Sequence, residues 1–344
     1  MKTKMSDLMI LSMITFFTIS NFVGCTSKSS VEEWPSRPIS IVVGFKAGGG
    51  QDVTCRALQP ALAEYLKVNV SVVNMPGASG SVAAEYVKNQ PKDGYTWYST
   101  SSSIGTWPTS AVSDIHYKHF STLHINVSPT SVISVPANSP YKNMNDLIKA
   151  IKGGGTTAAN SGLMDQYHVP QAALVDILGG KVRYVPYEGG APAALAVVKG
   201  EVDWGTHTET EGKQFFIDKL SRPLACFSNE PLKLEGYGVI PPITDYVPGL
   251  KDTITAIGAF RGIAVHKDVP EKIKTKIRDA CKFAVGSPKF KEWAKSANLT
   301  ILDIGGDEAE RIMEQTTQLR SWLMFDLGVG NRSPEKVDVP RPKK

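Results

Sequence analysis

The chain has 344 residues, of which 42% are hydrophobic, and a formal net charge of +5. This length is enough for two compact domains, each with its own hydrophobic core. The sequence has no dense patch of lysine and arginine interleaved with aromatic residues, and part of the basic excess lies in the C-terminal tail. We therefore expect no nucleic-acid partner.

Residues 1–24 have the pattern of an export signal. Lys2 and Lys4 provide a positive start, and an apolar stretch runs from Leu8 to Val23. The folded part of the chain is accordingly expected outside the cytoplasm.

Cys25 follows Gly24 and precedes a polar run that is rich in serine. This arrangement resembles a bacterial lipoprotein processing site, so we expect a lipid on Cys25, a tether over residues 25–33 and attachment to a membrane. Ordinary cleavage remains an alternative because Phe22 departs from the usual leucine. A retained membrane helix is a third alternative, although the stretch is short and polar for a span.

Residues 39–66 read as a strand, a glycine turn and a helix. A β-branched apolar run from Ile39 to Val43 leads into a turn that ends in three glycines, 48–50. Asp52 is a good N-cap, and apolar residues then recur at helical spacing. Free backbone N–H groups at the positive end of a helix favour a small anion, and the loop lacks the ending of a nucleotide P-loop. A tight turn without a ligand is the alternative.

Strands and helices then alternate along the chain. Strands are expected at 70–73, 95–99, 156–160, 182–187, 202–205 and 224–227, and extended connections at 123–135 and 257–265. Helices are expected at 81–90, 146–151, 161–178, 193–199, 271–285, 288–297 and 307–326.

This alternation indicates an α/β protein with parallel sheets and helices on both faces. The two extended connections indicate two domains joined by two crossovers. Ligands of such sheets bind beyond the carboxyl ends of the strands. Four loops rich in glycine or serine are expected there, at 47–50, 100–103, 160–162 and 189–190.

The order of several short motifs resembles the Bug-type receptors, which are the extracytoplasmic solute-binding proteins of tripartite tricarboxylate transporters. The resemblance covers about residues 34 to 325. The motifs are Trp34-Pro35 with Arg37-Pro38-Ile39, Gly48-Gly49-Gly50 with Asp52, Asn74 with Pro76-Gly77-Ala78 and Gly80, Asp93-Gly94-Tyr95-Thr96, Ser161-Gly162 with His168, Val185-Pro186-Tyr187-Glu188-Gly189-Gly190-Ala191-Pro192, Gly200-Glu201-Val202-Asp203, Pro241-Pro242-Ile243-Thr244, Val247-Pro248-Gly249 and Gly262-Ile263-Ala264.

The resemblance implies a two-domain periplasmic-binding-protein (Venus flytrap) fold, with a mainly parallel sheet and flanking helices in each domain. Residues 34–132 and 262–344 would form domain 1, and residues 133–261 domain 2. Such a protein captures a small carboxylate-bearing organic acid in the interdomain cleft and delivers it to the membrane permease subunits. We expect a monomer that is not an enzyme and needs no cofactor.

The resemblance also implies which residues bind the ligand, mainly through backbone amides and hydroxyl groups. They are Ala47, Gly48, Gly49, Asp52, Ser161, Gly189 and Gly190. The loops that carry them, and the serine-rich loop at 100–103, add further candidates of our own, namely Phe45, Lys46, Ser101, Ser102, Gly162 and Tyr187.

Two departures from the family pattern bear on the ligand. Lys46 stands where the family has an uncharged residue, so a pairing with a second ligand carboxylate is one hypothesis and a solvated surface lysine the other. Met164-Asp165 replace a common Gly-Ser. Asp165 could repel a carboxylate, recognise an amine or cap a helix.

Two other classes of function remain as alternatives, a hydrolytic enzyme and a ligand-sensing lobe for a signalling partner. The sequence lacks a G-x-S-x-G nucleophile elbow. His116, His119 and His124 fall in an expected loop, where solvated histidines are a commoner outcome than a metal site. We therefore expect no metal.

Overall fold

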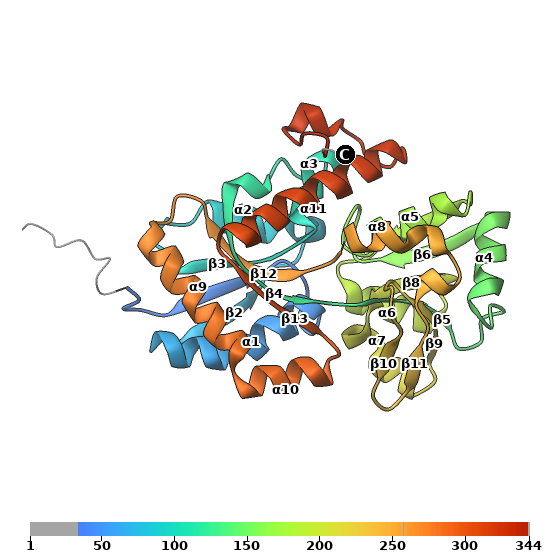
Figure 1. The fold of residues 1–344 in the computed structure, drawn as a ribbon, viewed down its shortest axis with the longest axis horizontal. Coiled ribbons are helices and arrows are strands. Elements are labelled where there is room, and N and C mark those ends of the chain that lie inside the picture. The colour runs from blue at the N-terminus through green and yellow to red at the C-terminus, as the bar shows by residue number, and fades with distance from the viewer. Residues whose placement is uncertain (1–33, 257, 343–344) are drawn as a thin grey trace, which may run out of the picture. The chain divides into compact units, whose positions relative to one another are not determined.

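The computed structural model describes residues 34–256 and 258–342. The predictions for the signal peptide, the tether and Cys25 lie outside the described residues. Figure 1 shows two β-sheets with helices packed against them, and we call each sheet with its helices a lobe.

The first lobe is built on a six-stranded mixed sheet. Its strand order is β13-β4-β12-β3-β1-β2. Strand β1 pairs in parallel with β2 and β3, whereas the pairings of β12 with β3 and β4, and of β13 with β4, are antiparallel. The strands are β1 (Ile39–Val43), β2 (Val70–Asn74), β3 (Thr96–Ser101), β4 (Phe120–Ser128), β12 (Arg261–His266) and β13 (Thr300–Gly305).

The helices of this part of the chain begin with α1, which follows β1 directly, and end with the long α11. They are α1 (Gly50–Leu66), α2 (Ser81–Lys88), α3 (Trp107–Ser110), α9 (Glu271–Gly286), α10 (Pro288–Ser296) and α11 (Asp307–Asp326). Helix α1 packs against β2 and α9, and it buries Leu58, Leu62 and Leu66.

The second lobe is built on a five-stranded mixed sheet of order β7-β6-β8-β5-β9. Strand β6 pairs in parallel with β7 and β8, and β5 pairs antiparallel with β8 and β9. The strands are β5 (Ser131–Pro136), β6 (Thr156–Asn160), β7 (Val182–Pro186), β8 (Trp204–Thr208) and β9 (Ser221–Cys226), followed by a hairpin of β10 (Leu232–Leu234) and β11 (Gly238–Ile240). The helices are α4 (Met144–Gly153), α5 (His168–Ile177), α6 (Gly190–Lys199), α7 (Glu209–Ile217) and α8 (Lys251–Ala256).

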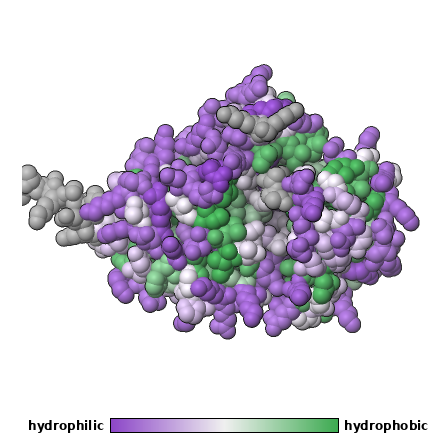
Figure 2. All heavy atoms as spheres, viewed as in Figure 1, coloured by the Kyte–Doolittle hydropathy of each residue, from purple (hydrophilic) through white to green (hydrophobic). Residues whose placement is uncertain are grey.

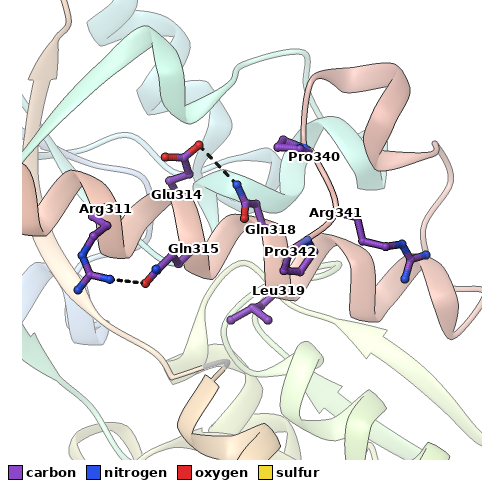
Figure 3. Close-up of a pocket in the computed structure, with 8 residues that line it drawn as sticks. All are labelled: Arg311, Glu314, Gln315, Gln318, Leu319, Pro340, Arg341 and Pro342. Carbon is purple, nitrogen blue, oxygen red and sulfur yellow. Dashed lines mark hydrogen bonds between the residues drawn. The ribbon is translucent and has the colours of Figure 1, made fainter. Parts of the chain in front are cut away.

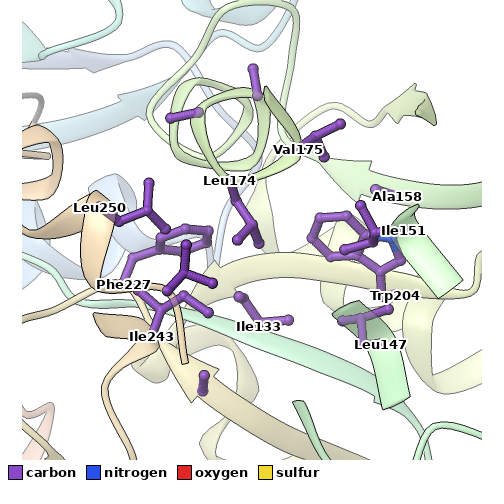
Figure 4. Packing of buried hydrophobic residues seen from close by; sticks show 14 of the residues in the cluster. Ile133, Leu147, Ile151, Ala158, Leu174, Val175, Trp204, Phe227, Ile243 and Leu250 are labelled. Carbon is purple, nitrogen blue, oxygen red and sulfur yellow. The ribbon is translucent and has the colours of Figure 1, made fainter. Parts of the chain in front are cut away.

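The core of the second lobe lies between this sheet and helices α4 and α5. Figure 4 shows Trp204 and Ile133 of the sheet facing Leu147 of α4 and Leu174 of α5, and all four are fully buried. Met324 of α11 belongs to the same core. The first lobe has a separate core that includes Tyr98, Trp107 and Met313.

The two-domain α/β architecture confirms the expectation, but the sheets are mixed and not mainly parallel. The two segments taken for extended connections cause the difference. Residues 123–135 contain most of β4 and β5, which are internal strands of the two sheets, and β12 returns to the first sheet from the second lobe. Strands that arrive through such crossovers enter antiparallel to their neighbours.

Each of the predicted helices occurs, although one begins later than expected and several elements were not predicted. Helix α5 begins at His168 and not at residue 161, because Gly162 (φ 155°) and Met164 (φ 55°) adopt non-helical backbone angles. Helices α3, α7 and α8 and strands β10, β11 and β13 were not predicted. Helix α11 has the predicted bounds.

Candidate functional site

The turn between β1 and α1 presents the N-terminus of α1 to the second lobe. Gly48 has φ 81°, a left-handed conformation that favours glycine, and Gly49 precedes the helix in an extended conformation. Gly49 is the N-cap residue of α1 and, as a glycine, has no side chain to accept a hydrogen bond from the helix. The first backbone N–H groups of α1 therefore need acceptors from outside the helix.

Asp52 was expected to be the N-cap of α1, but the N-cap position is Gly49 and Asp52 lies in the first turn of the helix. Its buried carboxylate accepts hydrogen bonds from the Gly48 N–H (2.9 Å), the Asn74 amide (2.9 Å) and the Arg56 guanidinium (3.0 Å). Burial raises the pKa of Asp52, but the hydrogen bonds from Arg56, Gly48 and Asn74 outweigh it and leave the pKa below its usual value. Because its partners come from its own lobe, Asp52 shapes the loop and leaves the anion site to backbone amides.

The second lobe contributes another helix N-terminus. Gly189 precedes α6 with φ 130°, which requires glycine, and Gly190 is the first residue of the helix. A Cβ on Gly190 would overlap the carboxylate of Glu211. The Gly190 backbone was expected to lie close to a bound ligand, and it lies close to the Glu211 side chain instead.

The Glu211 carboxylate lies where these two helix N-termini meet. One oxygen, Oε1, accepts a hydrogen bond from the Gly50 N–H of α1 at 3.1 Å. The other, Oε2, accepts the Tyr167 hydroxyl and the Thr208 N–H, each at 2.9 Å. The α1 terminus is thus a carboxylate site, and a glutamate from the second lobe occupies it.

Arg261, the first residue of β12, lies beside the same helix terminus. Its side chain is buried, and a Cβ on Gly50 would overlap the guanidinium group. Its Nη1 donates to the Thr54 hydroxyl at 3.2 Å, whereas Nε and Nη2 have no hydrogen-bond partner within residues 34–256 and 258–342. Among the described residues no carboxylate forms an ion pair with Arg261.

Two further acids are buried around this position. Burial raises the pKa of Glu209 to about 8, although Arg261 opposes the effect. Burial also raises the pKa of Asp165 to about 7. Asp165 caps α5 by accepting the Tyr167 and His168 N–H groups, at 2.9 and 2.7 Å, and its other oxygen accepts the Ser161 hydroxyl. Of the three roles considered for Asp165, the structure shows the helix cap.

A small cavity of about 180 Å³ is lined by both lobes, and Glu211 and Arg261 are not among its lining residues. The β1–α1 side contributes Phe45, the segment 77–80 contributes backbone, and the second lobe contributes Gly162 and Tyr187. The Tyr187 hydroxyl donates to Glu201 at 3.2 Å, so the phenol is already partnered outside the cavity.

The remaining predicted residues separate into exposed and buried groups. Ala47 and Lys46 are exposed, and the Lys46 ammonium pairs with Glu188 of the second lobe at 2.8 Å. Ser101 and Ser102 are buried; the Ser101 hydroxyl accepts the Ser103 N–H, whereas the Ser102 hydroxyl has no partner. The structure therefore gathers the glycine loops at one place but engages Lys46 and Ser161 with protein carboxylates.

Sequence reasoning missed Glu211 and Arg261. The signal for Glu211 was the run Thr208-Glu209-Thr210-Glu211, but the preceding strand was expected to end at residue 205, and it continues to Thr208. Arg261 begins a strand that was taken for a connection, so nothing indicated that its side chain turns inward.

A larger hollow, of about 560 Å³, lies on the surface along α11 and the C-terminal segment. Figure 3 shows Arg311 donating to Gln315 and Gln318 donating to Glu314 within that helix. These polar groups satisfy one another, and the hollow contains none of the predicted site residues. We therefore place the functional site at the glycine loops.

Hydrophilic residues cover most of the face drawn in Figure 2, and apolar residues gather near its middle. No helix within residues 34–256 and 258–342 is both long and apolar enough to cross a membrane.

The described residues also contain no group of three or more histidines, cysteines and acids placed to hold a metal ion. The expectation of a solvated loop was wrong for His124, which is buried in β4 and bonds Asn126 and Asp303.

Comparison with known proteins identifies similar chains. A family model described as tripartite tricarboxylate transporter family receptor matches residues 54–328. A UPF0065 protein of Bordetella pertussis is 30% identical over 315 residues, which is 88% of this chain and 93% of that protein. The periplasmic binding protein BugD has a similar fold, with a TM-score of 0.75, 24% identity and coverage of 86% and 99% of the two chains. An R. palustris protein solved with adipate has a TM-score of 0.76, 22% identity and coverage of 86% and 98%.

Proposed function

Because this chain belongs to the receptor family of tripartite tricarboxylate transporters, we propose that it captures a small organic acid outside the cytoplasm and delivers it to membrane permease subunits. The observation that carries the proposal is the coordination of a carboxylate at the N-terminus of α1. The Gly50 N–H, the Tyr167 hydroxyl and the Thr208 N–H already bind such a group, that of Glu211.

The chemistry of this site favours a carboxylate ligand over a nucleotide or a sugar. The N-termini of α1 and α6 present backbone N–H groups and partial positive charge at one place. Arg261 adds a full positive charge. The adipate in the R. palustris protein is a ligand of the same class.

The ligand is then held between residues 34–132 with 262–344 on one side and residues 133–261 on the other. We propose these ranges as the two domains, except that Arg261 belongs with its strand β12 to the first and residues 131–132 with β5 to the second. They act in a monomer without a cofactor and without catalysis. A ligand-sensing lobe for a signalling partner is the alternative use of the same binding event.

Native mass spectrometry of the freshly purified protein, followed by calorimetric titration with mono-, di- and tricarboxylates, tests the proposal. We expect saturable binding of a carboxylate with no turnover. Failure of every carboxylate to bind, or conversion of the acid into a product, would contradict it.

We further propose that a lipid on Cys25 holds the receptor at the membrane, because Gly24-Cys25 follows an apolar run. Several acyl chains on one cysteine are sufficient for a stable anchor. Cys25→Ser should move the protein from the membrane fraction to the soluble fraction. Equal solubility of both forms would exclude the lipid anchor.

A further inference from the structure

We propose that Glu211 is an internal surrogate for the ligand: it occupies the carboxylate site in the absence of ligand, and the ligand carboxylate replaces it and pairs with Arg261. This inference rests on the proposed carboxylate-binding function and identifies two residues that set its affinity.

Glu211 satisfies the carboxylate site as a ligand would. Its two oxygens accept three hydrogen bonds, one from Gly50 in the first lobe and two from Tyr167 and Thr208 in the second. Glu211 comes from the first turn of α7, so the carboxylate reaches the α1 terminus across the space between the lobes. A glutamate in this position competes with any external carboxylate.

Arg261 has one edge of its guanidinium group without hydrogen-bond partners among the described residues. Nε and Nη2, the two unpartnered nitrogens, form one edge of the guanidinium group, and this edge binds a carboxylate through two parallel hydrogen bonds. The side chain is only 1% exposed, so water outside the protein does not solvate it. A buried cation with two unpaired donors is costly, and it is expected where a partner is still to bind.

One end of this edge lies near the α1 terminus. Nη2 of Arg261 is the atom nearest to the position that a Cβ on Gly50 would take, and the N–H of Gly50 binds Glu211. A ligand carboxylate that takes over the Gly50 N–H would thus meet Arg261 as well. Glu211 does not use Arg261, because it is held by Tyr167 and Thr208 on its own lobe. The ligand can therefore gain a contact that the surrogate lacks, which allows the exchange.

The exchange has a measurable consequence for affinity. If Glu211 fills the site for about nine-tenths of the time, the apparent Kd of an external carboxylate is about tenfold higher than the intrinsic Kd. Removing the glutamate side chain should recover this factor. Removing the bidentate edge of Arg261 should weaken binding by about tenfold or more, because hydrogen bonds between charged groups are lost.

The test uses acetate, the simplest carboxylate that any such site accepts, and the amide resonance of Gly50 as the reporter. We expect Glu211→Ala to lower the apparent Kd of acetate at Gly50 by about tenfold or more. Asp218→Ala removes an equal charge from the exposed far end of α7 and is the matched control, which should stay within about twofold of the wild type. Arg261→Lys in the Glu211→Ala background keeps the charge but should abolish the gain.

A second measurement does not depend on any ligand. In the ligand-free protein, the Gly50 amide should exchange with solvent about tenfold faster in Glu211→Ala than in the wild type, because its acceptor is gone. Thermal melting confirms that each variant is folded, and Glu211→Gln serves if the alanine variant is not.

The outcomes separate this inference from the function on which it rests. Carboxylate binding that Glu211→Ala leaves unchanged, or unchanged Gly50 exchange, would overturn the surrogate role alone. Binding that is insensitive to Arg261→Lys would overturn the role of Arg261. Absence of any carboxylate binding in the wild type and in Glu211→Ala would refute the receptor function itself.

Discussion

Replacing Asp52 by alanine should destabilise the protein through the loop that presents the α1 terminus. The Asp52 side chain is 3% exposed and accepts hydrogen bonds from Gly48, Asn74 and Arg56. Hydrogen bonds to a charged group contribute about 1.5–3 kcal/mol each. The Arg56 side chain is 47% exposed, so its contact contributes at most about 1 kcal/mol. Because water replaces part of the remainder, we expect a loss of about 2–4 kcal/mol.

The pH dependence identifies the charge as the cause. The pKa of Asp52 in the folded protein lies below its ordinary value of 3.8. The stabilisation is therefore fully present above that value and is lost as the pH falls through the folded pKa. The wild type and Asp52→Ala should differ most near neutral pH and approach each other in acid.

Urea denaturation followed by tryptophan fluorescence, at pH 7 and at about pH 3.5, measures this difference. Asp52→Asn is the matched control, since it keeps the shape and one acceptor oxygen but removes the charge, and it should lie between the other two proteins. A stability difference that is the same at both pH values would refute the role of the ionised carboxylate.

Three other predictions concern the cleft. Lys46→Ala should change the affinity for a dicarboxylate by less than about fivefold, because the lysine forms an exposed ion pair with Glu188. If parallel titrations show a larger loss for the dicarboxylate than for its monocarboxylate analogue, Lys46 instead binds a second carboxylate of the ligand. Gly190→Val should abolish the thermal stabilisation by a carboxylate while the free protein stays folded. The reason is that the valine side chain would fill the position that the Glu211 carboxylate now occupies. Wild-type affinity in this variant would show that the loop is not part of the site. Glu209→Gln should raise the free energy of unfolding at pH 9 but not at pH 4. Burial raises the pKa of Glu209 in the folded protein from 4.5 to about 8. Between these two values the native state holds a proton that the unfolded state has lost, so the wild type loses stability as the pH rises. Parallel unfolding curves for the two proteins across this range would contradict that account.

The sequence predicted the β1–α1 unit well because every local signal agreed. The apolar strand, the three glycines and the helical spacing after Asp52 all indicate the same structure, and β1 occurs where these signals place it. Helix α1 begins two residues before Asp52, the expected N-cap. Helix α11 was predicted for the same reason. Glycine loops at strand ends were likewise recognisable, since their geometry depends on local backbone angles.

The partners of those loops could not be predicted, because they depend on contacts between residues far apart in the chain. Gly50 and Glu211 are 161 residues apart, and their hydrogen bond follows from how the two sheets are brought together. The direction of β12 also depends on its neighbours β3 and β4, and without it the inward position of Arg261 was hidden. The residues that distinguish this site from a simple anion-binding turn are therefore tertiary features.

Helix α11 links the two hydrophobic cores and thereby constrains the mechanics of ligand capture. Met313 packs in the first core and Met324 in the second, so about 16 Å of continuous helix joins them. A helix of this kind acts as a rigid strut that keeps its two attachment points at a constant separation. We therefore expect the lobes to rotate about α11, and not to separate along it, when the ligand enters. Lengthening α11 by one turn should hold the two cores out of register.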